Sequence, residues 1–372
     1  MAANVEIVSE SLQYFDYCLS CMFCEFLPKI NKKYLWRLTD LFRLCIYPLL
    51  LANCGWCVIQ ELVNVEMAAN QTKLTYLMMF LGAVYQSLWK YFVILSYKKE
   101  LAKIKGFMKK LEKSIKEKDM MSGVRKFHLP ETLSITMTFV RIYFGITVIA
   151  SICTCLTNYY MTNTFLMYST PFLYHWLDIF IQSATFATFI IVVLGSDCVL
   201  VIIVSFLVGE LKITKDMASR ISEVTILKSM YEMHLTIHEI LDVLRRIFWQ
   251  LSLHMICSNF VMLCSNFYSM RYLSISIATV IGLLSITFQL IIVCSIGQIL
   301  LDKTQEVADA LQQTPWYELS VQEQKTFLVI LQMAQIPKGI DAGGVTVISA
   351  NTLVQVLKTS MSFVAFIYTV IN

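Results

Sequence analysis

The sequence contains few charged residues, few glycines and few prolines for its length. Only 15% of its 372 residues are charged, and there are 12 glycines and 6 prolines. About a quarter of the residues in a soluble domain are charged, so this chain cannot cover a water-facing surface of the usual kind. Hydrophobic residues make up 57% of the chain. We therefore expect an all-α membrane protein whose main solvent is lipid, rather than about two soluble domains.

Motifs of catalysis are also missing. There is no glycine-rich phosphate loop, no G-x-S-x-G turn and no set of nucleophile and base, so the sequence does not predict an enzyme or a cofactor. The net charge of +4 is small and the basic residues lie on no polar domain, which argues against nucleic acid as a partner. The first forty residues have no apolar run of signal-peptide type.

Metal-binding patterns are incomplete. The run CLSCMFC at 18–24 places three cysteines at steps of three, but no fourth ligand follows at iron–sulfur spacing, and one stripe of an amphipathic helix explains it better. The CGWC run at 54–57 lies in an apolar segment and is predicted to be buried packing. His234 and His238 share a helical stripe without a third ligand or the H-E-x-x-H order, so we predict a solvated face and no metal.

Seven stretches are long and apolar enough to cross a bilayer, which needs about 20 residues. The fourth is long, and the fifth is interrupted by His254, Asn259 and Asn266. The predicted spans are 40–61, 75–97, 134–158, 177–208, 249–269, 274–300 and 348–371.

The lysines and arginines set the orientation of these spans, because cytoplasmic loops carry most of them. The segment between spans two and three is crowded with lysine, whereas the alternate loops are nearly bare. We predict a cytoplasmic N-terminus and an extracellular C-terminus. The sequon Asn70-Gln-Thr72 falls in the first predicted outside loop, which agrees with this orientation without deciding it.

The cytoplasmic segments are predicted to be helical. Apolar residues recur at helical spacing through 227–248, so spans four and five are expected to continue into the cytosol. Ser320 and Glu323 form a capping-box pattern, and Pro337 and Gly339 end the helix that follows. We expect this to be an anchor helix, joined to the last span by a hinge-like link at 340–349.

Four charged residues lie within the predicted spans, namely Lys90, Arg141, Asp197 and Lys358. Charges are costly in hydrocarbon and usually face protein or water. A polar network in which Arg141 pairs with Asp197 is one reading. Helix ends that project past the bilayer, or lysines that snorkel, are an equally good one.

The outer halves of the spans combine aromatic side chains with small, weakly polar ones. Such a lining suits a pocket for a small apolar molecule, although ordinary helix packing uses the same residues. The candidate ligand-binding residues are Tyr76, Phe80, Thr147, Ile149, Ala150, Cys153, Ser183, Phe186, Ala187, Ala278 and Thr279.

The last span carries a polar stripe at steps of three and four. Its members are Thr352, Gln355, Thr359, Ser362, Phe366 and Thr369, with Val370 adjacent. Four copies around an axis would line a water-filled path, and a hydrophobic ring at Phe366 or Val370 would close it by dewetting. Hydroxyl groups that bond their own backbone or contact neighbouring helices are the alternative, which the residues alone favour slightly.

The tail from Trp316 to the end resembles the carboxyl end of insect odorant receptors. The positions that carry the resemblance are Pro337, Gly344, Ser349, Leu353, Val356, Leu357, Lys358, Thr359, Ser360, Ser362 and Phe363. Met361 stands where that family commonly has tyrosine, and Phe366 where an aliphatic residue is usual. The second departure leaves the gate residue open between Phe366 and Val370.

The resemblance implies an odorant-gated, nonselective cation channel subunit in the plasma membrane of olfactory neuron dendrites. Its implied partners are a small volatile odorant, olfactory coreceptor subunits in a heterotetramer, membrane lipid and permeating cations. It implies a pore lined by Thr359, Ser362, Phe366, Thr369 and Val370. The expected organisation is a cytoplasmic helical segment at 1–39, six spans over 40–300, an anchor helix and link at 301–346, and the pore helix at 347–372.

A G-protein-coupled receptor and a membrane transporter are the competing classes. The first places its N-terminus outside and carries D-R-Y and N-P-x-x-Y signatures, which this sequence does not have. The second needs convergent His, Asp and Glu within the spans, and there are few.

Overall fold

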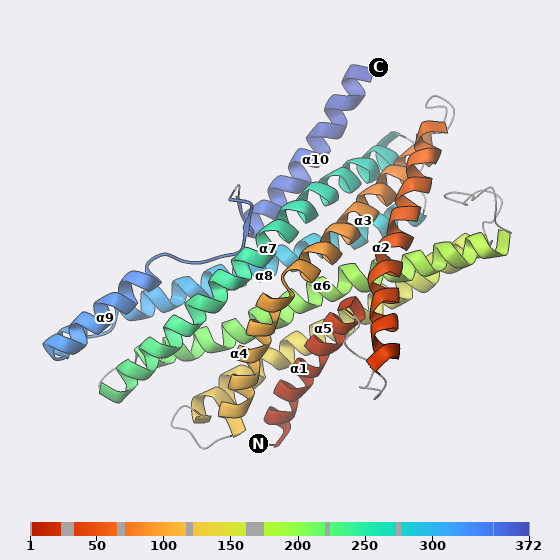
Figure 1. The fold of residues 1–372 in the computed structure, drawn as a ribbon. Coiled ribbons are helices and arrows are strands. Elements are labelled where there is room, and N and C mark those ends of the chain that lie inside the picture. Colours follow the sequence, from red (N-terminus) through yellow and green to blue (C-terminus); the bar gives the residue numbers. More distant parts are fainter. Residues whose placement is uncertain are drawn as a thin grey trace.

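The chain forms a bundle of long helices that run side by side for most of their length (Figure 1). The computed structural model describes residues 2–23, 33–64, 71–116, 122–160, 175–219, 224–272, 277–344 and 346–371. Each of the seven apolar stretches expected from the sequence overlaps one helix over most of its length. These helices are α2 (Lys33–Asn64), α3 (Gln71–Ser96), α5 (Ser122–Tyr160), α6 (His175–Ala218), α7 (Val224–Tyr272), α8 (Ile277–Gln312) and α10 (Ala350–Ile371).

Shorter elements complete the described part of the chain. They are α1 (Ala2–Phe23), α4 (Lys98–Lys116), the 3-10 helix η1 (Trp316–Glu318), α9 (Val321–Ala334) and the strands β1 (Asp341–Ala342) and β2 (Thr346–Val347). α1 packs against α4, α5 and α6. Cys18 on α1 is buried in the core, as expected for an amphipathic helix, whereas Cys24 lies outside the described residues.

Five helices contain a stretch long and apolar enough to cross a membrane within the described residues. These stretches are Leu77–Ser96, Ile191–Ala218, Leu227–Arg271, Gly282–Gln312 and Ala350–Val370. In α2 the apolar stretch found among the described residues, Pro48–Gln60, is shorter. The protein therefore has membrane-spanning helices, while the count of seven and the orientation of the termini stay predictions.

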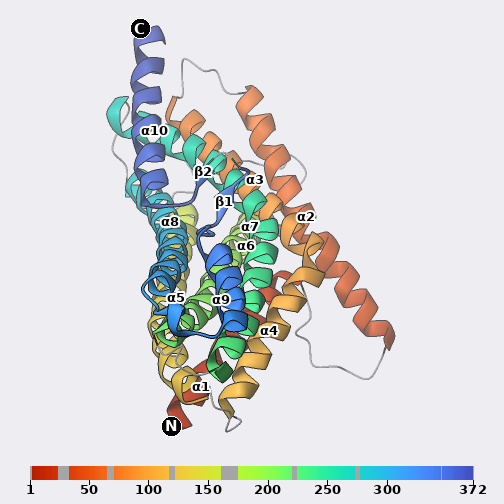
Figure 2. The same cartoon turned by 90° about the vertical axis from the view of Figure 1, so that its left-hand side faces the viewer.

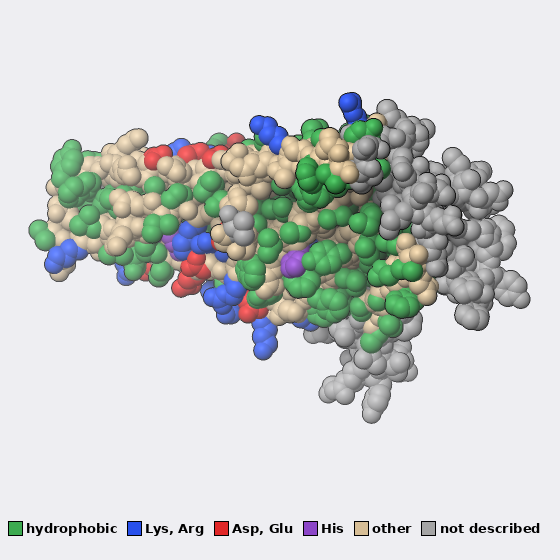
Figure 3. Space-filling view, turned by 90° about the horizontal axis from the view of Figure 1, so that it is seen from above, with side chains coloured by type: hydrophobic (Ala, Val, Ile, Leu, Met, Phe, Trp, Pro, Cys, Tyr) green, Lys and Arg blue, Asp and Glu red, His purple; other side chains and the backbone are tan. Residues whose placement is uncertain are grey.

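Two of these helices are much longer than a bilayer is thick. α6 has 44 residues and α7 has 49, whereas about 20 residues cross the hydrocarbon core. Figure 3 shows charged side chains gathered mainly over the half of the molecule that contains α9, and hydrophobic side chains over much of the rest. The sequence predicts that the charged half of each long helix lies outside the membrane.

The centre of the bundle is α6. Every residue from Val192 to Leu211 is buried, because α5, α8, α1 and α3 all pack around it. A helix that is apolar on all sides is stable only in such a position or in lipid. α6 therefore organises the core into which the other helices turn their apolar faces.

The segment after α8 leads back to the bundle in two steps. α9 begins with the predicted capping box, in which the backbone N–H of Ser320 donates to the Glu323 carboxylate at 2.8 Å. The link that follows was predicted to be hinge-like, which stays a prediction, and it contains a strand pairing that was not predicted. β1 and β2 pair as an antiparallel hairpin, which Gly343 and Gly344 allow by adopting φ of 65° and 72°.

α10 stands at one side of the bundle and carries the C-terminal end away from it (Figure 2). Its partners within the chain are α7 and α8. α2 lies on the opposite side in the same view. This arrangement leaves much of α10 without a covering helix.

Candidate functional site

One face of α10 is fixed by α7 and α8. Ser360 and Val364 are buried on it, and the Sγ of Cys264 on α7 donates to the Ser360 carbonyl oxygen at 3.8 Å. The ring of Phe363 lies 5.6 Å from that of Phe260, centroid to centroid. The residues of this face recur at helical spacing, so packing against the bundle fixes the rotation of α10 about its axis.

The opposite face of α10 carries the polar stripe and is exposed. Gln355, Thr359, Ser362, Phe366 and Thr369 all lie on it, and Val370 lies beside them. The side chain of Phe366 is 63% exposed, which is unusual for a phenylalanine unless another surface covers it.

Thr352 does not belong to this exposed stripe. It is buried, and its hydroxyl donates to the Val347 carbonyl oxygen at 2.8 Å, because the hairpin folds over the first turn of α10. The alternative role for hydroxyls is seen at Thr369, which donates to the Phe366 carbonyl oxygen at 2.8 Å. The hydroxyl oxygen of Thr369 can still accept a hydrogen bond from another group.

The base of α10 is held close to α8 by a glycine. A Cβ at Gly297 would overlap the carbonyl oxygen of Ile348, which precedes α10 by two residues. Backbone cannot move aside as a flexible side chain does, so only glycine permits this approach. The Ile348 N–H in turn donates to the Ile340 carbonyl oxygen at 2.8 Å.

The predicted ligand pocket falls mostly on side chains that are not described. These are Tyr76, Thr147, Ala150, Cys153, Ser183, Phe186, Ala187 and Ala278. Of the others, Thr279 is fully buried on α8, Phe80 packs beside the α2–α3 contact, and Ile149 lies on the exposed side of α5. These three do not meet at one described cavity, and the pocket stays a prediction.

A set of buried amides on α3 and α7, here called the polar seam, was not anticipated as a site. Its members are Gln86, Asn259 and Asn266, which are all buried. Within the described residues, both side-chain polar atoms of Asn259, the Oδ1 of Asn266 and the Nε2 of Gln86 have no hydrogen-bond partner. Unpaired buried amides are costly, so they indicate a place where water or a ligand supplies the missing bonds. The only sequence signal was the interruption of the fifth span.

A polar network within the spans was one of two readings of the sequence, and the structure contains such a network with different partners. Asp197 on α6 accepts from Lys90 on α3 at 2.6 Å and from Gln289 on α8 at 2.9 Å. The pair of Arg141 with Asp197, which belonged to that reading, is wrong. Arg141 lies on the exposed side of α5 and pairs with Glu10 of α1, whereas Asp197 faces the centre of the bundle.

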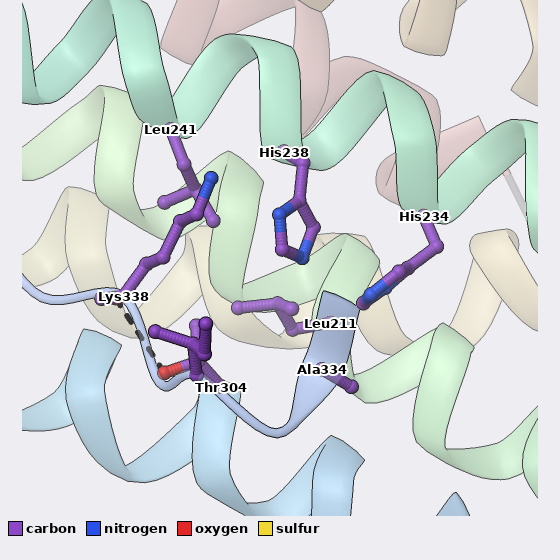
Figure 4. A pocket seen from close by; sticks show the side chains of 8 residues that line it. Leu211, His234, His238, Leu241, Thr304, Ala334 and Lys338 are labelled. Carbon is purple, nitrogen blue, oxygen red and sulfur yellow. Dashed lines mark hydrogen bonds between the residues drawn. The ribbon is translucent and has the colours of Figure 1, made fainter. Parts of the chain in front are cut away.

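The two histidines on α7 are buried, so the predicted solvated face is also wrong. His234 is 3% exposed and His238 is 9% exposed, with ring centroids 4.4 Å apart. Figure 4 shows both rings extending from α7 toward Leu211 of α6 and Ala334 of α9. The cavity between them measures about 10 Å³, roughly room for one water molecule.

The electrostatics of this cavity keep the histidines neutral. Burial is the main cause and the nearby Lys338 ammonium contributes, and together with the other local charges they lower the pKa of His234 to about 3 and that of His238 to about 4. Lys338 itself pairs with Asp242 at 2.7 Å. In the described part of the chain no three His, Cys, Asp or Glu residues converge as metal ligands.

Comparison with known sequences decides the family. The sequence model described as 7tm Odorant receptor matches residues 70–361, which is most of the chain. The chain belongs to the odorant receptor family. The family resemblance seen in the tail is thereby confirmed, and membership in a receptor family agrees with the absence of enzyme motifs.

One individual relative matches a short segment of the chain. The odorant receptor chain is 35% identical to Odorant receptor 49a of Drosophila melanogaster over 83 residues, which is 22% of this chain and 21% of that relative. The matched segment thus spans about a fifth of the relative's length. It is a local match within the family.

Solved structures share the fold over nearly the whole chain. The insect olfactory receptor OR5 from Machilis hrabei in complex with eugenol superposes with a TM-score of 0.77 at 13% identity, covering 97% of both chains. A structure described without that ligand gives a TM-score of 0.74 at 14% identity, covering 93% of both. At such low identity the likeness shows the fold alone. The odorant receptor chain therefore has the architecture of an insect olfactory receptor.

Proposed function

We propose that this odorant receptor chain is a subunit of an odorant-gated, nonselective cation channel in the plasma membrane. In this proposal it assembles with olfactory coreceptor subunits in a heterotetramer. A small volatile ligand binds in the outer half of the helix bundle. The last helix of each subunit lines the central pore, with the N-terminus in the cytoplasm and the C-terminus outside.

The observation that carries the proposal is the division of α10 into two faces. One face packs on α7 and α8, while Gln355, Thr359, Ser362 and Thr369 are left exposed on the other. Hydroxyl and amide groups on a lipid-facing surface would gain nothing, whereas several copies around an axis would hydrate a passage. Phe366 and Val370 lie at the end of this face and are the candidate gate residues.

Ligand binding opens the pore only if the ligand favours the open arrangement of the terminal helices. The buried and unpaired amides of the polar seam offer hydrogen bonds to an odorant with a hydroxyl or carbonyl group. The predicted pocket residues add aromatic and small apolar surface. A lining of this composition recognises a small apolar molecule with one polar group.

The decisive experiment is co-expression with the olfactory coreceptor and recording of whole-cell current against an odorant panel that includes eugenol. We expect an odorant-dependent cation current that needs this chain for its ligand specificity. Tags on both termini, tested with and without permeabilisation, check the orientation independently. An extracellular N-terminus would rule out the proposed pore geometry.

The pocket is tested by enlarging small side chains within it. Ala150→Val and Ala187→Val are expected to shift the odorant concentration for half-maximal current about tenfold, since one or two methyl groups are worth roughly 1–3 kcal/mol in a pocket. Ion permeability ratios should not change. Dose–response curves identical to those of the unaltered receptor for both variants would remove this pocket.

A further inference from the structure

A second recognition surface lies far from the predicted odorant pocket, where α7 meets the β1–β2 hairpin. It is an open groove of about 360 Å³ lined by Arg245, Arg246, Trp249, Asp341, Gly343 and Gly344. Figure 2 shows both strands lying beside α7 near the base of α10. Neither the odorant pocket nor the exposed face of α10 includes any of these residues.

The groove carries more positive than negative charge, with two arginines and one aspartate in its lining. Arg245 donates to the Asp341 carboxylate at 2.8 Å, which ties α7 to the hairpin. Arg246 is exposed and forms no ion pair with any described residue. The Nε of Arg245 is buried without a hydrogen-bond partner in the described part of the chain. The groove thus has one uncompensated guanidinium group, that of Arg246.

Two glycines keep the groove open. A Cβ at Gly343 would come within 3.1 Å of Leu253 and 3.6 Å of Trp249, while Gly344 faces open space. The hairpin turn can therefore lie directly over Trp249 without a side chain filling the groove.

The place of the two arginines along α7 indicates their level relative to the membrane. Arg245 and Arg246 directly precede the fifth predicted span, which begins at Trp249. Basic residues cluster on the cytoplasmic side of a membrane, and tryptophan is favoured at the level of the headgroups. On the proposed orientation, the groove opens at the inner membrane surface.

We propose that this groove binds a phosphorylated anion, supplied by the headgroup of an inner-leaflet phospholipid. Guanidinium forks match the oxygens of a phosphate group, and basic pockets beside helices on this side are suited to phosphorylated inositol headgroups. The bound phosphate accepts from the exposed Arg246 guanidinium, while Trp249 contacts the glycerol region. This inference rests on the proposed orientation and adds a ligand distinct from the odorant.

Binding there would act on the pore helix through a short connection. The hairpin ends at Val347 and α10 begins at Ala350. A headgroup that bridges α7 and the hairpin holds this connection in its packed form. The lipid therefore stabilises the arrangement of α10 seen in this structure.

The test uses the full-length chain purified with its coreceptor in detergent. Fluorescence polarisation follows a labelled short-chain phosphatidylinositol bisphosphate, with four unlabelled competitors: the same lipid, inositol trisphosphate, inorganic phosphate and short-chain phosphatidylcholine. Arg246→Gln removes the unpaired charge and leaves the Arg245–Asp341 pair intact. Arg271→Gln is the matched control, because Arg271 is an exposed arginine at the other end of the same helix.

We expect Arg246→Gln to weaken binding about fivefold, the effect of one basic residue near a phospholipid surface, and Arg271→Gln to leave it unchanged. Competition by inositol trisphosphate at least tenfold weaker than by the lipid supports a membrane source. If inositol trisphosphate competes as well as the lipid does, the result supports the same phosphate site occupied by a soluble ligand. Unchanged binding in Arg246→Gln, an equal loss in Arg271→Gln, or equal competition by phosphatidylcholine would overturn the site. Binding is read without current, so this result is independent of whether the complex conducts.

Discussion

The Nζ of Lys90 lies 2.6 Å from the Oδ1 of Asp197, and both side chains are buried at the centre of the bundle. Gln289 donates to the other carboxylate oxygen, so helices α3, α6 and α8 are joined at one point. A charge in this position is tolerated only with its partner in place.

Breaking this pair should therefore destabilise the receptor strongly. We expect Asp197→Leu or Lys90→Met alone to cost about 3–5 kcal/mol, because either change leaves one buried charge unpaired. The double variant should recover much of this loss, since an apolar pair of similar volume carries no desolvation penalty. Thermal unfolding of the detergent-solubilised chain, followed by tryptophan fluorescence, measures each variant.

The exposed pair of Lys116 and Glu112 on α4, outside the predicted spans, is the control for that experiment. Lys116→Gln should change the unfolding temperature little, because solvent screens a surface pair. A double variant as unstable as the worse single variant would show that Lys90 and Asp197 do not act as a pair.

Residues on the exposed face of α10 are expected to control permeation. Phe366→Ala should raise the basal current of the co-expressed complex, because it removes a hydrophobic side chain that would close a pore by dewetting. Changes at Thr369 and Val370 should alter conductance. Met361→Ala is the control, since Met361 is exposed on α10 but lies off the polar stripe. Patch-clamp recording that finds unchanged permeation in all three variants would exclude α10 as the pore helix.

The close approach at Gly297 predicts a sharp difference between two glycines. Gly297→Ala should destabilise the chain by about 1–3 kcal/mol, because the added methyl group meets the backbone oxygen of Ile348. Gly106→Ala should instead stabilise α4 by about 0.5–1 kcal/mol, since nothing lies within 4 Å of its Cβ position. Thermal unfolding distinguishes the two. A neutral Gly297→Ala variant would mean that α10 is not held at this point.

The histidine cavity predicts a loss of stability in acid. His234 and His238 lie outside the predicted spans, and their pKa values of about 3 and about 4 are below the ordinary value of 6.5. Between about pH 4 and pH 6.5 the folded state therefore binds fewer protons than the unfolded state. Stability should be constant above about pH 7 and fall as the pH drops through 6.5 toward 4.

Thermal unfolding between about pH 4.5 and 7.5 measures this effect. A His234→Gln and His238→Gln double variant should show a flatter pH dependence than the unaltered chain. Thr236→Ala, on the exposed side of the same helix turn, should keep the original slope. Equal slopes in all three proteins would show that the histidine pair is not responsible.

Apolar run length was enough to locate the long helices, because a membrane helix must be apolar over most of its length whatever its neighbours are. The capping box at Ser320 and Glu323 was equally local, since its hydrogen bonds join residues three apart. The hairpin at Gly343 and Gly344 was missed as a pairing, although the two glycines marked a turn. Two-residue strands are too short to carry an alternating pattern.

Which charges meet could not be read from the sequence. Arg141 and Asp197 both lie within predicted spans, so the sequence allowed them to pair. The rotation of α5 about its own axis instead turns Arg141 toward Glu10 of α1. The burial of His234 and His238 could not be predicted either, because it depends on which helices pack against α7. Periodicity showed one apolar face on that part of α7, whereas the packing of α6 and α9 covers a wider face.

The sequence by itself determined that the protein is helical and lipid-facing, that its tail resembles that of an odorant receptor, and that α10 carries polar residues at helical spacing. These follow from local composition and periodicity, which fix the faces of a helix before it packs. Only the tertiary structure decided which of those faces stays uncovered. α7 and α8 bury the side of α10 that holds Ser360 and Val364, and the opposite side, with Thr359, Ser362 and Phe366, is left for a partner or for water.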